Sequence, residues 1–586
     1  MAKGSGAVHV VRVVKKHTDK QGQEREYRSA YLRRSFRSGG KVMNETVANL
    51  SALPWEVITS IEAGLKGEQL VPAGSRATIA RSLPHGHVAA VTAQAKALGL
   101  PALLGPACRD RDIVLALIVA RVCRPGSKLA TTRWWTDTTL ATDLDLAAAS
   151  TDEVYAGMDW LAGRQEAIEV ALAARHLSPE ANPDRLALFD LSSSWVTGHH
   201  CPLAARGYSR DGKKGLEQIE YGLLTDPAGR PVAVRVVAGN TADPKAFENI
   251  AKEMKTTFNL QEMVMVGDRG MITSARIEAL KELGGLGWVT ALRAPAIKAL
   301  AADPGPLQMS LFDQANLAEI SHPDYPGERL IACRNPALAE ERARKRTELL
   351  AATETELAKI AAAVHAGRLR KEGPIGVRVG KVVGKYKMEK HFELTIAEHR
   401  FVFIRRQESI DTEAALDGVY VIRTTVPATR MDAGQVVATY KSLANVERDF
   451  RSIKSIDLSL RPIHHFTETR VRAHVFICML AAYLVWHLRQ AWAPLTFTDE
   501  DRPEPADPVA PAKRSDAATA KASTQTTAEG RPALSFRSLL EHLATLTRND
   551  IRYGPDTPAI PTLAEPTPLQ RRAFELIDRP IPLTLK

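Results

Sequence analysis

Apolar and polar residues alternate through the first fifty residues of the chain, a pattern typical of β-strands. Three such segments follow one another: VHVVRVV, YRSAYLRRSF and KVMNETVANL. The turn Ser38-Gly39-Gly40 separates the last two segments and predicts a hairpin between them. The N-terminal region is therefore predicted to be rich in strands.

The periodicity then becomes helical and later mixed. Across residues 54–176 apolar runs such as IVLALIVARV recur at helical spacing, and Ser127 in PGSKLATTRWW is a typical helix start. Across 186–293 short strands alternate with helical segments, and the strands RLALFD and EMVMVGD each end in an aspartate. YGLLTD and PVAVRVVAG predict a hairpin around residues 227–229. This alternation predicts an α/β fold.

Residues 295–416 depart from this alternation of short strands and helices. Within them, residues 336–365 predict a long, charged and exposed helix, and the strand-like HFELTI and FVFIRR follow. We interpret this segment as an insertion in a larger fold. The larger fold resumes with the strand GVYVIRTTV and a long helix over about 433–456. Residues 499–531, rich in Pro, Ala, Ser and Thr, predict a disordered linker before a last helix, SFRSLLEHLATL.

The net charge and the cysteine content of the chain limit the classes of protein to which it can belong. The chain has 586 residues, and 78 Lys and Arg against 67 Asp and Glu give it a net charge of +11. That balance favours a polyanionic partner. The segment YRSAYLRRSF and the residue after it contain four arginines that fit either a solvated sheet face or a DNA-contacting one: Arg28, Arg33, Arg34 and Arg37. Five scattered cysteines without a CxxC pair exclude a disulfide scaffold and a cysteine-built zinc site, and they suit a reducing cytosol.

The most apolar run of the chain is VFICMLAAYLVWHL, residues 475–488. It is shorter than the roughly 20 residues that a membrane span needs. We therefore predict a buried helix here and no contact with a membrane. The length of the chain predicts three or four domains.

Two aspartates are candidates for metal binding. Asp190 and Asp268 each end an apolar strand and precede small or turn-forming residues, among them the serines 192–194, which we interpret as a turn. In α/β sheets ligands gather at the carboxyl ends of strands, and carboxylate oxygens suit Mg²⁺ or Mn²⁺. The alternative is that each aspartate only caps a turn, which is common at strand ends.

The predicted helix at 433–456 supplies a third acid. Tyr440, Glu447, Arg451 and Lys454 are spaced so that they share one helical face. The face could be solvated, with a Glu447–Arg451 pair. It could instead add a third metal carboxylate beside cations that hold phosphates.

These motifs resemble the DDE transposases of bacterial insertion sequences, in the insertion-sequence-four superfamily and its sixteen-thirty-four-like branch. That branch has a Tyr-x2-Arg-x3-Glu-x6-Lys signature, which here is YKSLANVERDFRSIK, with Tyr440, Glu447 and Lys454 in place and Leu443 at the arginine position. Arg448 or Arg451 could replace that arginine. FDLSSSW, GDRGMIT and DGVYVIRTT, the closing RPIHHFTETRVRAHVFICMLAAYL and the N-terminal SFRSGGKVMNETVANLSAL extend the resemblance.

The resemblance implies an α/β fold with an RNase H-like catalytic core that an insertion domain interrupts, after an N-terminal β-hairpin and a helical DNA-binding region. It gives these expected parts: an N-terminal β-rich region (1–52), a helical DNA-binding region (53–180), the first part of the core (181–294), the insertion domain (295–416), the second part of the core (417–498), a disordered linker (499–531) and a C-terminal helical tail (532–586).

The resemblance also implies a function. A transposase of this kind binds terminal inverted repeats, then cleaves and transfers DNA strands with two Mg²⁺ ions, or Mn²⁺, held by Asp190, Asp268 and Glu447. Side chains expected to contact DNA are Tyr440, Arg451 and Lys454 on the signature helix and Arg210, Lys213 and Lys214 in the loop GYSRDGKKG. The expected partners are double-stranded DNA, at the transposon ends and the target, and a second copy of the chain, in the bacterial cytoplasm at the nucleoid.

Two other functions stay open at this point. One is a non-catalytic relic that binds transposon ends and represses, which Leu443 would permit and the complete acidic trio argues against. The other is an RNase H-like nuclease without strand transfer. We expect residues 1–150 to read the DNA sequence, although they contain no clear helix-turn-helix motif.

Overall fold

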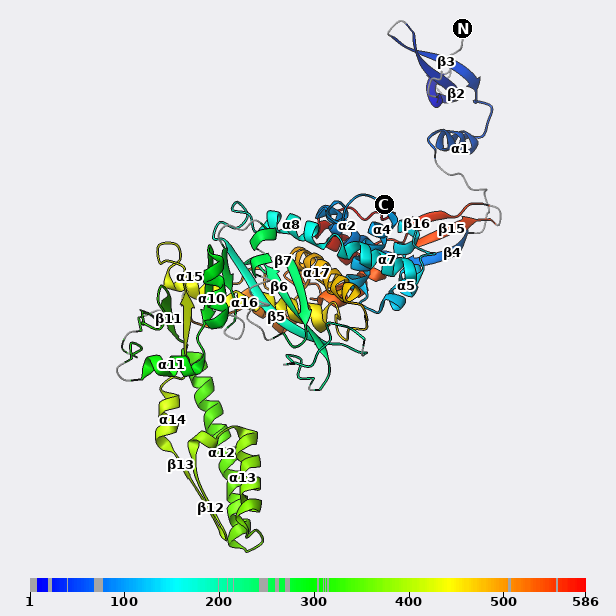
Figure 1. Ribbon diagram of the computed structural model, residues 1–586. Helices are drawn as coiled ribbons and strands as arrows, with labels where there is room; N and C mark the ends of the chain where they lie inside the picture. Colours follow the sequence, from blue (N-terminus) through cyan, green and yellow to red (C-terminus); the bar gives the residue numbers. More distant parts are fainter. Residues whose placement is uncertain are drawn as a thin grey trace. The chain divides into compact units, whose positions relative to one another are not determined.

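The computed structural model contains two compact units, one formed by Met1–Ser82 with Arg548–Thr562 and the other by Leu83–Thr547 with Leu563–Lys586. Figure 1 shows the chain coloured from its N-terminus in blue to its C-terminus in red. The structure describes the chain apart from residues 1–7, 19–23, 39–40, 68–76, 199, 208, 214, 242–250, 254, 259–262, 269–273, 303–304, 309, 311, 314–315, 504–506 and 555–556.

The first unit begins with an antiparallel sheet in the order β1-β2-β3. Its elements are β1 (Val8–Thr18), β2 (Glu24–Ser38) and β3 (Lys41–Asn49), followed by helix α1 (Trp55–Leu65). Ile58 of α1 shares a small apolar core with Ala30 of β2 and with Leu50, so α1 covers one face of the sheet. The N-terminal strands predicted from the sequence are confirmed, and Gly39 and Gly40 of the predicted turn lie outside the described residues.

A second sheet in this unit joins segments from the two ends of the sequence. Its strands are β4 (Ala77–Pro84), β15 (Thr547–Tyr553) and β16 (Ile560–Leu563), in the order β16-β15-β4. In Figure 1 the blue β4 lies beside the red β15 and β16. The prediction of a helical tail over 532–586 is therefore wrong in part, because β15 pairs with a strand that local pattern cannot reveal. Helices α19 (Phe536–Ala544) and α20 (Pro568–Leu576) flank the two strands in the chain.

A group of helices follows β4 and begins the second unit. They are α2 (Gly86–Ala97), α3 (Leu100–Leu104), α4 (Arg109–Cys123), α5 (Lys128–Thr136), α6 (Thr139–Leu144), α7 (Thr151–Ala162) and α8 (Gln165–His176). Ser127 caps α5, as predicted, because its hydroxyl accepts a hydrogen bond from the Ala130 N–H at 3.1 Å. Residues 113–123 of α4 are all buried, so this helix belongs to the core of the unit.

Helix α17 (Glu468–Ala491) packs against α4, α7 and strand β7. By length and composition alone this helix could cross a membrane, but 83% of its most apolar stretch is buried inside the protein. A core helix of a folded domain has the same features. The prediction of a buried helix at 475–488 is confirmed, and the helix extends beyond that run at both ends.

The central sheet of the second unit has eight strands in the order β10-β11-β14-β9-β8-β5-β6-β7. Their bounds are β5 (Leu186–Trp195), β6 (Gln218–Thr225), β7 (Pro231–Ala238), β8 (Met263–Val266), β9 (Leu286–Ala291), β10 (Leu317–Ile320), β11 (Arg329–Arg334) and β14 (Val419–Thr424). β5, β6 and β7 form an antiparallel meander with the predicted turn at 227–229, whereas β5, β8 and β9 run parallel. The predicted α/β alternation is therefore present.

Four further helices accompany this sheet in the chain: α10 (Ser274–Leu283), α11 (Ala294–Ala301), α15 (Ala433–Lys441) and α16 (Leu443–Arg451). The predicted long helix at 433–456 is interrupted at Ser442, where α15 ends, and a π-helical turn over Ser452–Ile456 follows α16. α11, β10 and β11 share an apolar core with β14. The sequence-based boundary of the insertion at residue 295 is therefore too early, because β10 and β11 belong to the central sheet.

Residues 336–414 have a hydrophobic core of their own. The elements are α12 (Pro336–His365), α13 (Glu372–Tyr386), β12 (Phe392–Ala397), β13 (Arg400–Arg405) and α14 (Gln407–Ala414). α12 has the predicted bounds, and its side chains at Leu350, Leu357 and Val364 are buried on one face. The segment lies between β11 and β14 in the chain, so it interrupts the central sheet in sequence.

The prediction of a disordered linker over 499–531 is wrong where helix α18 (Asp516–Thr524) forms. Lys521 of this helix is buried, donates to the carbonyl oxygens of Ala493 and Thr498, and pairs with Glu500 at 2.9 Å. Composition indicates disorder because the segment has few apolar residues. Here polar groups with satisfied hydrogen bonds hold the segment against the end of α17 instead.

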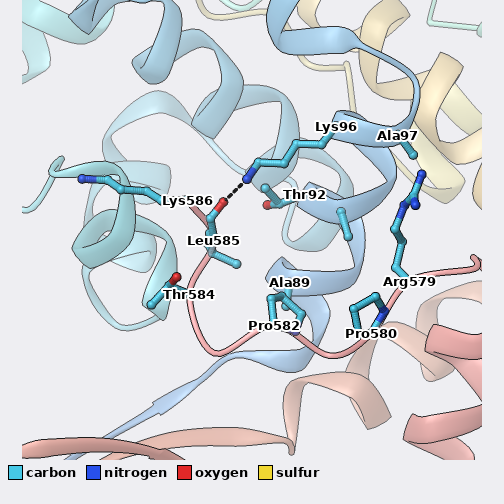
Figure 2. Close-up of a pocket in the computed structure, with 11 residues that line it drawn as sticks. Ala89, Thr92, Lys96, Ala97, Arg579, Pro580, Pro582, Thr584, Leu585 and Lys586 are labelled. Atoms are coloured by element: carbon cyan, nitrogen blue, oxygen red, sulfur yellow. Dashed lines mark hydrogen bonds between the residues drawn. The ribbon is translucent and has the colours of Figure 1, made fainter. Parts of the chain in front are cut away.

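The last residues of the chain run along α2, as Figure 2 shows. Lys96 donates to the carbonyl oxygen of Leu585 at 2.6 Å, and the Leu585 N–H donates to Asp143 at 2.8 Å. A cavity of about 380 Å³ lies between this segment and α2. None of the three candidate metal-binding carboxylates lines it, so it is separate from the site described next.

Candidate functional site

Asp190 lies on β5, and Asp268 lies just beyond the end of the neighbouring parallel strand β8. β5 and β8 pair so that Leu188 is opposite Val266, and each aspartate comes two residues later in its chain. β5 does not end at Asp190 but continues to Trp195, so the prediction that residues 192–194 form a turn is wrong. These serines are buried in the strand, where they pair with β6.

Glu447 reaches the same region from a distant part of the sequence. It lies on α16, which packs against β5. The buried face of α16 consists of Leu443, Val446 and Phe450, and the Phe450 ring lies 5.7 Å from Tyr221 of β6, edge to face. The predicted apolar stripe therefore fixes the helix on the sheet, while Glu447 on its other face remains exposed.

The electrostatics of Asp190 reflect this convergence. The pKa of the Asp190 carboxyl is raised from 3.8 to about 6, mainly by burial, and the negative charges of Asp268 and Glu447 contribute to the increase. The Leu191 N–H, which donates to Asp190 at 2.8 Å, and the Arg210 guanidinium, 3.9 Å away, oppose the increase. The charges of Asp268 and Glu447 thus both act on Asp190. Within the described part of the chain, no three His, Cys, Asp or Glu side chains are close enough together to hold one metal ion.

Basic side chains surround the end of β5. Lys454 and Arg461 both pair with Asp211, a carboxylate that is only 4% exposed, and the Lys454 distance is 2.9 Å. The second oxygen of Asp211, Oδ2, has no hydrogen-bond partner among the described residues. Burial lowers the pKa of Lys454, and the Asp211 carboxylate opposes that decrease. Two half-buried cations therefore share one buried carboxylate.

Trp195, the last residue of β5, has two cations close to its ring. The guanidinium of Arg461 is 5.0 Å from the Trp195 ring, and the Lys213 ammonium is 5.5 Å from it. Arg210 donates to the Leu191 carbonyl, which anchors it near Asp190. Three of the predicted DNA contacts, Arg210, Lys213 and Lys454, thus gather at one end of β5, whereas Lys214 lies outside the described residues.

The other two predicted DNA contacts lie elsewhere on the signature segment. Tyr440 is half-buried against the main core, and Arg451 is exposed. Leu443, at the position where the family signature has arginine, is buried in that core. The sequence did not single out Asp211, Arg461 or Trp195. Asp211 stands in the quoted loop GYSRDGKKG, but nothing local connects it to Lys454, 243 residues away.

Asp190→Asn is expected to stabilise the metal-free protein at about pH 7. Because the pKa of Asp190 is raised on folding, folding takes up a proton between about pH 4 and pH 6. The contribution of this group to stability is full below its unfolded pKa and is lost as the pH rises through about 6, a cost of about 3 kcal/mol at most. The asparagine variant avoids that cost.

The measurement is thermal unfolding in EDTA at several pH values. Asp184→Asn, an exposed site just before β5, serves as the control and should unfold like the wild type. An Asp190→Asn variant that melts at the wild-type temperature near pH 7 would contradict the raised pKa.

Two family models match this chain. The one described as "Transposase DDE domain" matches residues 185–484, which is half of the chain and runs from the start of β5 into α17. The protein therefore belongs to the DDE transposases. The second model, "IS1634 family transposase, N-terminal domain", matches residues 14–73 and identifies the chain as an IS1634-like transposase of an insertion sequence. The family predicted from the motifs is confirmed.

No curated protein matches the chain. Among solved structures, the cryo-EM structure of the piggyBac transposase synaptic complex with hairpin DNA is similar over 74% of this chain and 70% of that chain. The two share 8% sequence identity with a TM-score of 0.32, a similarity too weak to carry an argument about the fold or the site.

Proposed function

We propose that this transposase, acting as a dimer, binds the terminal inverted repeats of its insertion sequence, cleaves the DNA at their ends and transfers the ends to target DNA. The observation that supports this most is the set of Asp190, Asp268 and Glu447. Asp190 is on β5, Asp268 follows the end of the parallel strand β8, and the charges of Asp268 and Glu447 act on Asp190. Carboxylates that repel one another raise the free energy of a folded protein, so such a set fits a cation site better than a packing role.

The sheet supports an RNase H-like catalytic core. In the order β7-β6-β5-β8-β9, an antiparallel meander continues into two parallel strands, with β5 in the centre. This is the strand arrangement of that fold, and it puts the first acid on the central strand. The separate hydrophobic core of residues 336–414 supports the insertion domain.

The cofactor we propose is Mg²⁺, with Mn²⁺ as a substitute, held by Asp190, Asp268 and Glu447 once these side chains move closer together than they are in this metal-free structure. The donors are all carboxylate oxygens, which these hard cations prefer. The raised pKa of Asp190 fits a cation site, because burial and the neighbouring carboxylates disfavour its charged form and a bound cation would offset both effects. When bound, such ions stabilise the charge on the attacking and leaving oxygens of a phosphodiester. The three side chains serve as ligands, so the reaction needs no covalent link between protein and DNA.

The basic side chains around β5 are proposed to hold the DNA phosphates. Lys454 and Arg461 already bind one oxyanion, the carboxylate of Asp211, in a largely buried position. A DNA phosphate offers the same charge and the same acceptor oxygens. Arg210 and Lys213 extend this surface along the loop after β5, and the sequence adds Lys214, Tyr440 and Arg451 as further candidate contacts.

Of the two alternatives, the repressor relic is the less well supported. Leu443 is buried on the face of α16 that packs into the core, so the leucine has a structural role there. Exposed Arg451 remains on the same helix to meet a phosphate. A nuclease without strand transfer would use the same carboxylates, and only its products would distinguish it.

The test is incubation of the purified protein with DNA carrying the inverted repeats that flank its gene, in Mg²⁺ and in EDTA. We expect cleavage at the repeat ends in Mg²⁺ alone and joining of those ends to a supercoiled target plasmid. Cleavage without joining would favour the nuclease, and selective binding without cleavage would favour the repressor.

A further inference from the structure

The N-terminal sheet of β1, β2 and β3 has a covered face and an open face. On the covered face, Val10 and Leu32 pack with α1, and Arg12 pairs with Glu62 of that helix at 2.9 Å. Residues opposite each other on antiparallel strands point to the same side. The strand register therefore places the following side chains on the other, open face: His9, Val11, Val13, Lys15, His17, Tyr27, Ser29, Tyr31, Arg33, Ser35, Arg37, Val42, Asn44, Thr46 and Asn49.

The two faces differ in their carboxylates. Among the described side chains of the three strands, the open face carries Lys15, Arg33 and Arg37 and no carboxylate. The carboxylates of the strands, Glu24, Glu26 and Glu45, all fall on the covered face, where they partly offset five cations: Arg12, Lys16, Arg28, Arg34 and Lys41. A face with cations and no carboxylate attracts a polyanion.

The open face also has side chains suited to reading bases. Ser35 donates to Asn44 across the strands at 2.6 Å, and the Arg33 guanidinium lies 5.9 Å from the Tyr31 ring. Arginine pairs with the edge of guanine and asparagine with the edge of adenine in the major groove. Exposed Tyr27 adds a flat surface that can pack on the sugar-phosphate backbone.

We propose that the open face of the N-terminal sheet enters the major groove of the terminal inverted repeat and reads its sequence. This rests on the proposed function and adds the surface and the mode of recognition. Three strands about 4.8 Å apart span about 10 Å, which fits a major groove about 12 Å wide. Arg33, Arg37 and Asn44 contact base edges, and Lys15 contacts a phosphate. A β-sheet thus takes the role that a recognition helix has in other DNA-binding proteins.

The experiment compares full-length variants on two fluorescent duplexes, one carrying the inverted repeat and one with the same bases in shuffled order. Arg33→Gln and Arg37→Gln are expected to lose about ten- to a hundredfold in affinity for the repeat and most of the preference over the shuffled duplex. Asn44→Ala should lose preference with little change in salt dependence, because it removes no charge.

Arg28→Gln is the matched control. Arg28 lies on the same strand and carries the same charge, but it is on the covered face, where it pairs with Glu26 at 2.6 Å. The control should keep nearly full preference for the repeat. Equal losses for Arg28→Gln and Arg37→Gln, or wild-type preference in Arg37→Gln, would overturn the inference. A wild type that binds both duplexes equally would instead overturn the proposed function. Circular dichroism of each variant shows whether a loss of binding is due to misfolding.

Discussion

Asp190→Asn is expected to abolish DNA cleavage while leaving binding to the inverted repeats nearly unchanged. The substitution removes one of three acidic metal ligands that we propose, and a bound metal ion contributes several kcal/mol of transition-state stabilisation. A loss of that size slows cleavage by about a thousandfold or more. Asp268→Ala and Glu447→Ala should have the same effect. The measurement is the rate of end cleavage in Mg²⁺, with binding of the same DNA followed in parallel.

The control is again Asp184→Asn, an exposed acid just before β5. It removes the same charge from the neighbourhood and should cleave like the wild type. Since Asp190→Asn is also expected to melt at a higher temperature than the wild type without metal, loss of cleavage cannot be attributed to unfolding. Retained cleavage in any of the three variants would remove that residue from the metal site.

Glu328→Ala is expected to lower the free energy of unfolding by about 3–5 kcal/mol. Glu328 is 1% exposed and accepts a hydrogen bond from the Arg423 guanidinium of β14 at 2.6 Å. The Trp288 indole of β9 donates to the same carboxylate at 3.3 Å. Removing the carboxylate leaves a buried guanidinium without a counter-charge, which is the costly half of a buried ion pair. Denaturant unfolding followed by tryptophan fluorescence measures the change.

Glu319→Ala gives a matched comparison, because Glu319 pairs with Arg329 on the same sheet at 2.7 Å but is 44% exposed. We expect a loss of less than about 1 kcal/mol there. The double variant Glu328→Ala with Arg423→Leu should recover most of the loss, since no buried charge remains. If both substitutions lowered the free energy of unfolding equally, burial would not make the Glu328–Arg423 pair more important for stability than the exposed pair.

The sequence correctly predicted those parts of the fold that are determined by residues close together in the chain. The bounds of α12 follow from its helical periodicity, and the start of α5 follows from the Ser127 cap. The α/β alternation predicted the apolar strands beside Asp190 and Asp268, and the signature spacing placed Glu447 on a helix. For these features a few neighbouring residues contain the information.

Features that depend on distant partners could not be predicted in this way. Asp211 binds Lys454 across 243 residues of sequence, and no pattern near either residue indicates the other. Residues 192–194 looked like a turn because serine favours turns, but pairing with β6 extends the strand through them. The segment 499–531 has the composition of a linker, yet the buried Lys521 finds carbonyl partners at the end of α17.

Because β4 pairs with β15, the first compact unit cannot finish folding until β15 has been synthesised. β4 is made early, whereas β15 begins at Thr547, near the other end of the sequence. At about 5–20 residues per second, a ribosome needs tens of seconds to synthesise the chain between them. Throughout that interval β4 lacks the strand with which it pairs in the folded protein. The unit that we propose selects the transposon ends is therefore finished only after β15 has been synthesised, and a chain cut short before β15 cannot complete it.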